Sequence, residues 1–185
     1  MTDPAPPLRV PTLFRHCPRC GHGPSEPGPA PFYSCPSCGF HYHFNPAVAA
    51  GVLVADDAGR VLFLRRDREP AKGRLGVPGG FVDLGESAED SAKREALEET
   101  GIEVEDLAFL GSWPNLYEFR GVVYSVVDLY FTGRTRDARA ARPLQEAAEL
   151  LWRRPEEVDP SLLAFPTTRA AVARLVERRA RPPRG

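Results

Sequence analysis

The chain has very little lysine: Lys72 and Lys93 are the only two, and arginine supplies almost all of the positive charge. The net charge is close to zero, with 24 basic and 25 acidic residues among 185. This balance excludes a strong overall field that would draw the chain to nucleic acid or to an anionic membrane. The apolar share of 42% and the charged share of 26% are typical of a soluble globular protein.

Long apolar runs are also missing. No stretch is long enough to span a membrane, and the start, MTDPAPPLRVPTLF, has neither the basic nor the apolar region of a secretion signal. We therefore expect a cytoplasmic protein, in which thiols stay reduced. The cysteines are accordingly interpreted first as metal ligands.

Two Cys-x2-Cys pairs lie within residues 13–44, and they consist of Cys17, Cys20, Cys35 and Cys38. Each pair brings two thiolates within reach of one ion, and two pairs complete a tetrahedral Zn²⁺ site. Because protein thiolates fill every position, the pattern predicts a structural rather than a catalytic zinc. Two disulfides or redox-active dithiols are the alternative, and a neighbouring histidine could replace one ligand. Only Arg15 and Arg19 are basic in this segment, which argues against nucleic-acid binding by residues 13–44.

The rest of the chain alternates strand and helix patterns behind a proline-rich tail, residues 1–12, that we expect to be disordered. The predicted strands cover residues 48–55, 61–66, 102–113, 122–133 and 150–154, and the predicted helices cover about 87–100 and 165–180. This order predicts an α+β or mixed α/β domain over residues 45–180, with the zinc ribbon (13–44) in front and a short tail (181–185) behind.

Three glutamates, Glu95, Glu98 and Glu99, fall within about 100° of arc on two turns of the first predicted helix. Such like charges repel unless solvent screens them or a cation binds them. The other residues of this face are all small: Ala88, Ser91 and Ala92. A core-facing stripe would carry larger apolar side chains, so we interpret the face as one that a glycine loop and a hard cation approach closely. Mg²⁺ (or Mn²⁺) suits that description, because it uses few carboxylates and leaves positions for water and phosphate oxygens.

The segment from Gly80 to Ile102 carries a family resemblance. It reads Gly80-x5-Glu86-x7-Arg94-Glu95-Ala96-Leu97-Glu98-Glu99-Thr100-Gly101-Ile102, and it resembles the box of the Nudix hydrolases, Gx5Ex7REUxEExGU, in which U is a bulky aliphatic residue. Ala96, at the first U, is the one soft departure. The resemblance implies an α/β/α sandwich around a mixed sheet. It also implies hydrolysis of a nucleoside diphosphate linked to another group, yielding two monophosphates.

The resemblance also implies roles for single residues. Glu98 and Glu99 would be the main Mg²⁺ ligands, and Glu95 would be a further ligand or the base that deprotonates the attacking water. Arg94 would hold Glu95 in place, and it belongs with Glu95 and Glu98 to the expected catalytic set. The remaining expected metal-site residues are the Gly79 carbonyl, Glu86, and an acid outside the box, for which Glu146 and Glu149 ahead of Trp152 are the candidates. An ordinary solvated loop is an equal alternative for that last pair.

The substrate is less well specified. A zinc ribbon followed by FHYHFNP resembles the NADH pyrophosphatase arrangement, whereas LGSWPNLYEF departs from the SQPWPFPxS array of that group, and only a short tail stands where an extra domain is usual. We expect a small nucleotide of the NADH/NAD, ADP-ribose or FAD type. Removal of an NAD cap from RNA and a non-catalytic nucleotide sensor are the alternatives. Nudix domains are often dimers, so a homodimer is compatible with the resemblance. The expected substrate-binding residues are Arg66, Arg74, Trp113 and Tyr117, although the arginines would otherwise be solvated and the aromatic rings would otherwise pack the sandwich.

Overall fold

We analysed a computed structural model of the chain, which describes residues 8–24 and 31–181. The chain divides into two compact units. One comprises Met1–Ala47 and Leu116–Val126, and the other comprises Val48–Asn115 and Val127–Gly185. The predicted disorder of residues 1–7 and most of the predicted C-terminal tail lie outside the described residues, while residues 8–13 form a short strand, β1 (Leu8–Arg9), and a 3-10 turn, η1 (Val10–Leu13).

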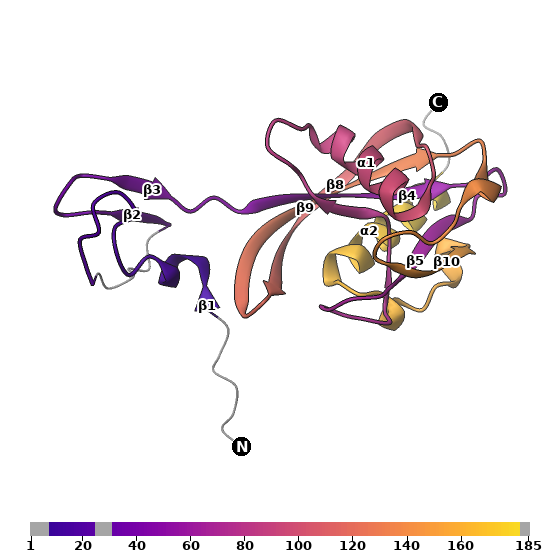
Figure 1. Cartoon of the computed structure of the whole chain (residues 1–185). Coiled ribbons are helices and arrows are strands. Elements are labelled where there is room, and N and C mark those ends of the chain that lie inside the picture. The colour runs from indigo at the N-terminus through magenta and orange to yellow at the C-terminus, as the bar shows by residue number, and fades with distance from the viewer. Residues whose placement is uncertain (1–7, 25–30, 182–185) are drawn as a thin grey trace, which may run out of the picture. The chain divides into compact units, whose positions relative to one another are not determined.

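The large sheet is mixed, as predicted (Figure 1). Its eight strands include the path β1-β9-β4-β5-β10, while β6 pairs with β5, β7 with β4 and β8 with β9. The β1–β9 pairing is parallel, whereas β5 pairs antiparallel with both β4 and β10. The strands are β4 (Ala47–Ala55), β5 (Val61–Arg66), β6 (Leu75–Gly76), β7 (Gly79–Phe81), β8 (Glu105–Phe119), β9 (Val122–Arg134) and β10 (Ala147–Arg153).

Two helices complete the second unit, α1 (Ala88–Thr100) and α2 (Pro166–Ala180), together with the 3-10 turns η2 (Ala138–Ala140), η3 (Pro155–Glu157) and η4 (Pro160–Leu162). Both helices lie within one or two residues of the predicted bounds. None of the helices in the described ranges is both long and apolar enough to cross a membrane.

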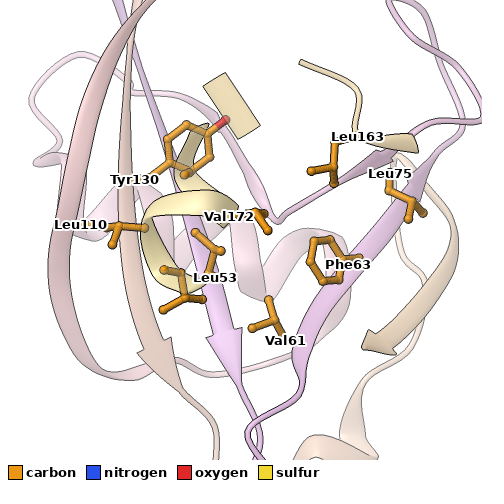
Figure 2. Packing of buried hydrophobic residues seen from close by; sticks show 10 residues of the cluster. Leu53, Val61, Phe63, Leu75, Leu110, Tyr130, Leu163 and Val172 are labelled. Atoms are coloured by element: carbon orange, nitrogen blue, oxygen red, sulfur yellow. The ribbon is translucent and has the colours of Figure 1, made fainter. Parts of the chain in front are cut away.

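The sheet separates two hydrophobic cores, because successive strand residues point to opposite faces. On one face, Leu53 and Phe63 pack with Val172 of α2 (Figure 2). On the other face, Val52 and Leu62 of the same two strands pack with the α1 alanines. This arrangement confirms the predicted α/β/α sandwich.

The segment between β5 and α1 carries no predicted strand, but it contains the short strands β6 and β7. Sequence patterns for strands depend on β-branched and aromatic residues, and these strands are mostly glycine. Gly79 pairs with Gly51 of β4, and a Cβ on Gly79 would lie 2.5 Å from the Ala50 carbonyl oxygen. Only glycine allows this close pairing, so β7 is formed by tertiary contact rather than by local preference.

The ribbon in the first unit contains an antiparallel hairpin, β2 (Phe32–Ser34) and β3 (His41–His43). Its two cysteine turns repeat one geometry. The amide of Gly21 donates to the carbonyl of Cys17 at 2.9 Å, and the amide of Gly39 donates to that of Cys35 at 3.0 Å. Both glycines have positive φ, 73° and 69°, which explains the glycine after each pair.

Candidate active site and metal centres

The position of the glutamate helix is determined at both ends by local chemistry. Ser87 is the N-cap, and its hydroxyl oxygen accepts a hydrogen bond from the Asp90 amide at 3.1 Å. Gly101 closes the helix with φ 70°, and its amide donates to the Leu97 carbonyl at 2.9 Å. These caps agree with the predicted helix bounds, and they determine where the helix that carries the glutamates begins and ends.

One expectation about this helix is wrong. The face that carries Ser91 and Ala92 does fill an interior: both residues are 0% exposed, and Glu99 on the same side is 4% exposed. Small side chains here let the helix axis come close to the sheet, which buries the face without large apolar groups. The close packing also brings a carboxylate into the protein interior.

Gly79 and Gly80 bring the backbone against the glutamates. The Gly79 amide donates a 3.0 Å hydrogen bond to Oε2 of Glu99. A Cβ on Gly80 would lie 2.2 Å from Oε1 of Glu95, closer than any real Cβ contact. The two glycines therefore allow β7 to lie directly on the acidic side of α1.

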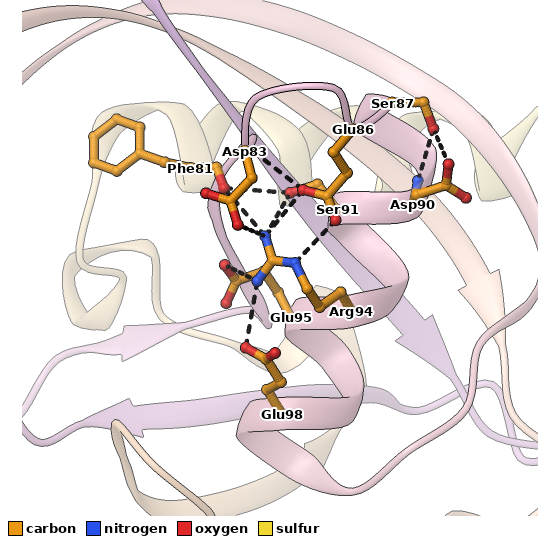
Figure 3. Close-up of polar contacts among 9 residues, drawn as sticks. All are labelled: Phe81, Asp83, Glu86, Ser87, Asp90, Ser91, Arg94, Glu95 and Glu98. Atoms are coloured by element: carbon orange, nitrogen blue, oxygen red, sulfur yellow. Dashed lines mark hydrogen bonds and ion pairs between the residues drawn. The ribbon is translucent and has the colours of Figure 1, made fainter.

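Arg94 connects the carboxylates (Figure 3). Its guanidinium donates to Glu86 at 2.9 and 3.1 Å, to Glu95 at 2.9 Å and to Glu98 at 3.3 Å. It also donates to the Phe81 carbonyl oxygen at 3.3 Å, which ties the side chain to β7. The planar, permanently charged fork of arginine suits such multiple contacts better than an ammonium group would.

Burial and charge separate the pKa values of these acids. The hydrogen bonds from Arg94 lower the pKa of Glu86 to about 2. Burial raises the pKa of Glu95, and it raises the pKa of Glu99 to about 8, with the charges of Glu95 and Glu146 adding to the effect on Glu99. Two neighbouring carboxylates are thus hard to ionise together unless a cation joins them.

The two acids proposed as metal ligands outside the box, Glu146 and Glu149, have different ion-pair partners in the structure. Glu146 forms an ion pair with Arg68, and its charge acts on both Glu95 and Glu99. Glu149 pairs instead with Arg65 of β5 at 2.8 Å. Glu146 is therefore the acid that shares the electrostatic environment of the helix glutamates.

The expected substrate residues are dispersed. The Arg66 guanidinium donates to the Pro70 carbonyl oxygen at 2.8 Å and lies 5.1 Å from the Phe165 ring centroid, and its charge offsets part of the rise in the pKa of Glu99. Arg74 donates instead to the Ser161 carbonyl. Trp113 packs against the α2-side core, edge to face with Tyr130 at 5.8 Å. Tyr117 stacks with Phe119 at 6.5 Å in the first unit.

A buried polar chain on the α2 side was not anticipated from the sequence. Oδ2 of Asp128 accepts hydrogen bonds from Asn115 at 2.9 Å and from the Thr167 hydroxyl at 2.6 Å. The Tyr130 hydroxyl lies 2.9 Å from that of Thr168. The only signal was a lone carboxylate in the apolar run VVYSVVDLYFTG. Burial raises the pKa of Asp128.

The acidic site fits a hard divalent cation. It offers the carboxylates of Glu95, Glu98 and Glu99, and the side chain of Glu98 is 40% exposed, so a ligand can reach it from solvent. The backbone of Gly80 lies so close to the Glu95 carboxylate that a Cβ there would collide with it. Carboxylate oxygens with an open side are the donor set that Mg²⁺ prefers.

The cysteine cluster fits zinc. The four sulfur atoms all lie within 4.8 Å of one another. Sγ of Cys17 lies 3.7 Å from that of Cys38, and Sγ of Cys20 lies 3.7 Å from that of Cys35. A tetrahedron of sulfurs about 2.3 Å from a central ion has edges of about 3.8 Å, so these separations match a Zn²⁺ site.

A mixed sheet between two helices, with a glycine loop against a capped acidic helix, defines the class as a Nudix-type α/β/α protein. The chain belongs to the NUDIX domain family, whose family model, described as NUDIX domain, matches residues 45–176. The match includes the loop, α1, Glu146 and most of α2, which ends at Ala180.

Individual relatives agree with this assignment. The chain is 32% identical over 103 residues to the NAD-capped RNA hydrolase NudC of Haemophilus influenzae (strain PittGG), a match that covers 54% of this chain and 38% of that protein. It is 37% identical over 90 residues to the ADP-ribose pyrophosphatase of Methanocaldococcus jannaschii, covering 48% and 52% of the two chains. The chain thus spans about half or less of the length of these relatives. A NUDIX hydrolase from Nitrosomonas europaea shares the fold, with a TM-score of 0.66 at 23% identity over 90% of this chain and 94% of that one.

Proposed function

We propose that the chain is a Mg²⁺- or Mn²⁺-dependent pyrophosphatase that hydrolyses the diphosphate bond of a nucleoside diphosphate derivative to two monophosphates. The observation that carries this proposal is the complete acidic set, in which Glu95, Glu98 and Glu99 lie against the Gly79–Gly80 backbone. A sensor built on the same fold would need no such set. Retention of every box carboxylate therefore supports the enzyme over a non-catalytic regulator.

The chain's own residues would position the reacting groups. Glu98, Glu99 and the Gly79 carbonyl, with Glu86 and Glu146 at the margin, would hold the divalent ions. When bound, the metal supplies Lewis-acid activation of water and neutralises charge on the leaving phosphate. Arg94 holds Glu95 at 2.9 Å and so orients its carboxylate, while the raised pKa of Glu95 makes it a better proton acceptor. Glu95, Arg94 and Glu98 form the proposed catalytic set.

For the substrate we propose a small nucleotide of the NADH/NAD, ADP-ribose or FAD type. Arg66 is the best-supported phosphate contact, because its charge reaches Glu99. Arg74, Trp113 and Tyr117 remain proposals with weaker support. Arg66 and Arg74 each donate to a carbonyl oxygen, but the charge of Arg74 is not among the main causes that shift the pKa of Glu99, and the Trp113 ring packs on the core. The ADP-ribose pyrophosphatase relative is consistent with this substrate class.

The test is hydrolysis of a panel with Mg²⁺ or Mn²⁺: NADH, NAD, FAD, ADP-ribose and nucleoside triphosphates. Wild type is compared with Glu98→Gln, which keeps size and removes one charge, and with Glu149→Gln as a matched acid outside the proposed set. We expect Glu98→Gln to lose at least about a hundredfold in kcat and Glu149→Gln to lose little. Hydrolysis of no panel member above the Glu98→Gln rate would show that the enzyme proposal is wrong.

A second candidate substrate is RNA carrying a 5′ NAD cap, and it is favoured by the similarity to NudC of Haemophilus influenzae. The near-neutral charge of the chain does not favour extended contact with RNA. NAD-capped RNA therefore belongs in the same panel, with free NAD as competitor. A higher kcat/KM for the capped RNA than for free NAD would select this alternative.

The other proposals concern zinc, location and assembly. We propose one structural Zn²⁺ held by the four thiolates, the ribbon over residues 13–44 and the catalytic domain over 45–180. A cytoplasmic location is proposed from the sequence pattern, and four cysteines that form no disulfide are compatible with it. A homodimer is proposed only as compatible with the family and is tested by sedimentation.

A further inference from the structure

A cavity of about 400 Å³ lies in the first compact unit, and none of the acidic-site residues lines it. Its walls come from four separated segments: the β1–η1 segment, Pro31 just before β2, the end of β3 with the residues after it, and the stretch of β8 and β9 that belongs to this unit. This volume is in the range of pockets that hold small molecules. Neither the zinc site nor the proposed hydrolysis uses it.

Aromatic side chains form part of the cavity wall. Tyr42, Phe44 and Tyr124 line it. Tyr42 stacks on Phe14 with ring centroids 5.3 Å apart and planes at 22°, and Phe44 meets Phe14 edge to face at 4.8 Å. Because Phe14 holds two of the three rings from outside the cavity, they offer fixed surfaces to a planar ligand. Aromatic side chains are suited to stacking on nucleobases whatever the base.

Three polar side chains also line the cavity: Arg9, Asn45 and Ser125. Within residues 8–24 and 31–181, none of their side chains makes a hydrogen bond or ion pair. The backbone of Arg9 is held in register with Val123 by the parallel β1–β9 pairing, which places its side chain at the cavity. A cation without a carboxylate partner, an amide and a hydroxyl are thus available to a ligand.

We infer that this cavity binds one nucleotide unit, separate from the diphosphate bond that the acidic site would cleave. The base stacks on the aromatic walls, Asn45 and Ser125 contact its polar edge or the ribose, and Arg9 binds the phosphate. An aliphatic ligand would leave the three polar groups unused, and a neutral sugar would leave the cation unused. One arginine matches one phosphate group, so the site takes a single unit rather than a long strand.

The experiment is a titration of the ¹⁵N-labelled full chain with AMP, without added Mg²⁺, followed by amide chemical shifts. We expect saturable shifts at Asn45 and Ser125. Arg9→Gln should weaken binding about tenfold, because it removes a charged hydrogen-bond donor to phosphate. Arg15→Gln is the matched control, since Arg15 is an exposed arginine of the same unit that does not line the cavity, and it should leave binding unchanged. Because no hydrolysis is measured, the result is independent of the proposed function.

Ligand fragments and further variants sharpen the test. Adenosine and ribose 5-phosphate should each bind at least about fivefold more weakly than AMP, and Tyr124→Ala should weaken AMP similarly. Asn45→Ala is the gentler variant should Tyr124→Ala fail to fold. A short single-stranded RNA that binds more tightly than AMP, with the same dependence on Arg9, identifies RNA as the source of the nucleotide. Tighter binding of AMP identifies a free nucleotide. Absence of shifts, equal binding by Arg9→Gln and Arg15→Gln, or ribose 5-phosphate binding as tightly as AMP would overturn the inference.

Discussion

Glu99 should make the metal-free protein less stable as the pH rises. Burial raises its pKa from the ordinary 4.5 to about 8. A carboxyl group whose pKa is higher in the folded state contributes stability below about pH 4.5, and this stability is lost as the pH rises to about 8. The difference between the two pKa values corresponds to about 5 kcal/mol. Glu99→Gln keeps an oxygen to accept from the Gly79 amide but has no proton to lose.

The free energy of unfolding of both proteins should therefore be measured by urea titration from pH 4 to 9 in the absence of divalent ions. Both tryptophans, Trp113 and Trp152, lie in the second unit with Glu99, so their fluorescence reports on the right part of the chain. Relative to wild type, Glu99→Gln should gain up to about 5 kcal/mol across this range. Mg²⁺ should stabilise wild type at pH 8 far more than the variant. Parallel stability profiles, within about 1 kcal/mol of each other at every pH, would refute the reasoning.

Three further predictions test the loop, the ribbon and the buried polar chain. Gly80→Ala should displace the Glu95 carboxylate and lower kcat about a hundredfold with little loss of stability. The control Gly76→Ala, whose Cβ would lie 3.6 Å from its nearest neighbour, should keep the wild-type kcat, and equal kcat values for the two variants would contradict the close approach of Gly80 to Glu95. Cys17→Ser should lose the bound zinc found by elemental analysis while tryptophan fluorescence stays unchanged, and retained zinc would exclude the four-thiolate site. Asp128→Ala should lower the free energy of unfolding by about 1–3 kcal/mol, since it leaves buried donors without an acceptor. An unchanged free energy of unfolding would show that the hydrogen bonds of Asp128 do not stabilise the protein.

The elements that the sequence predicted well depend on short-range chemistry. The bounds of α1 agree with the predicted range, because the caps Ser87 and Gly101 need only residues within one turn of each helix end. The strand β5 has the predicted bounds, since its apolar run is bordered by turn residues. The strands β6 and β7 were missed because glycine carries no strand preference and only pairing with β4 and β5 forms them.

Within the site, the sequence predicted relations between residues close together in the chain but not contacts between distant segments. The box spacing placed Glu95, Glu98 and Glu99 on one side of a helix. It did not show that Ser91 and Ala92 are buried with Glu99, because burial depends on how near the sheet comes. Likewise, Glu146 and Glu149 look equivalent in the sequence, and only the pairing of β10 with β5 places Glu149 opposite Arg65, with which it forms an ion pair.

The sequence by itself therefore determined the helix, its caps, the order of its carboxylates and the paired cysteine turns, because each follows from the spacing of neighbouring residues. The tertiary structure decided the rest. It joined Arg94 to Glu86, raised the pKa of Glu99 by burial, packed Trp113 against the core and assembled an aromatic cavity from four separated segments. These properties arise from groups far apart in the chain, and their burial and charge exist only once the chain has folded.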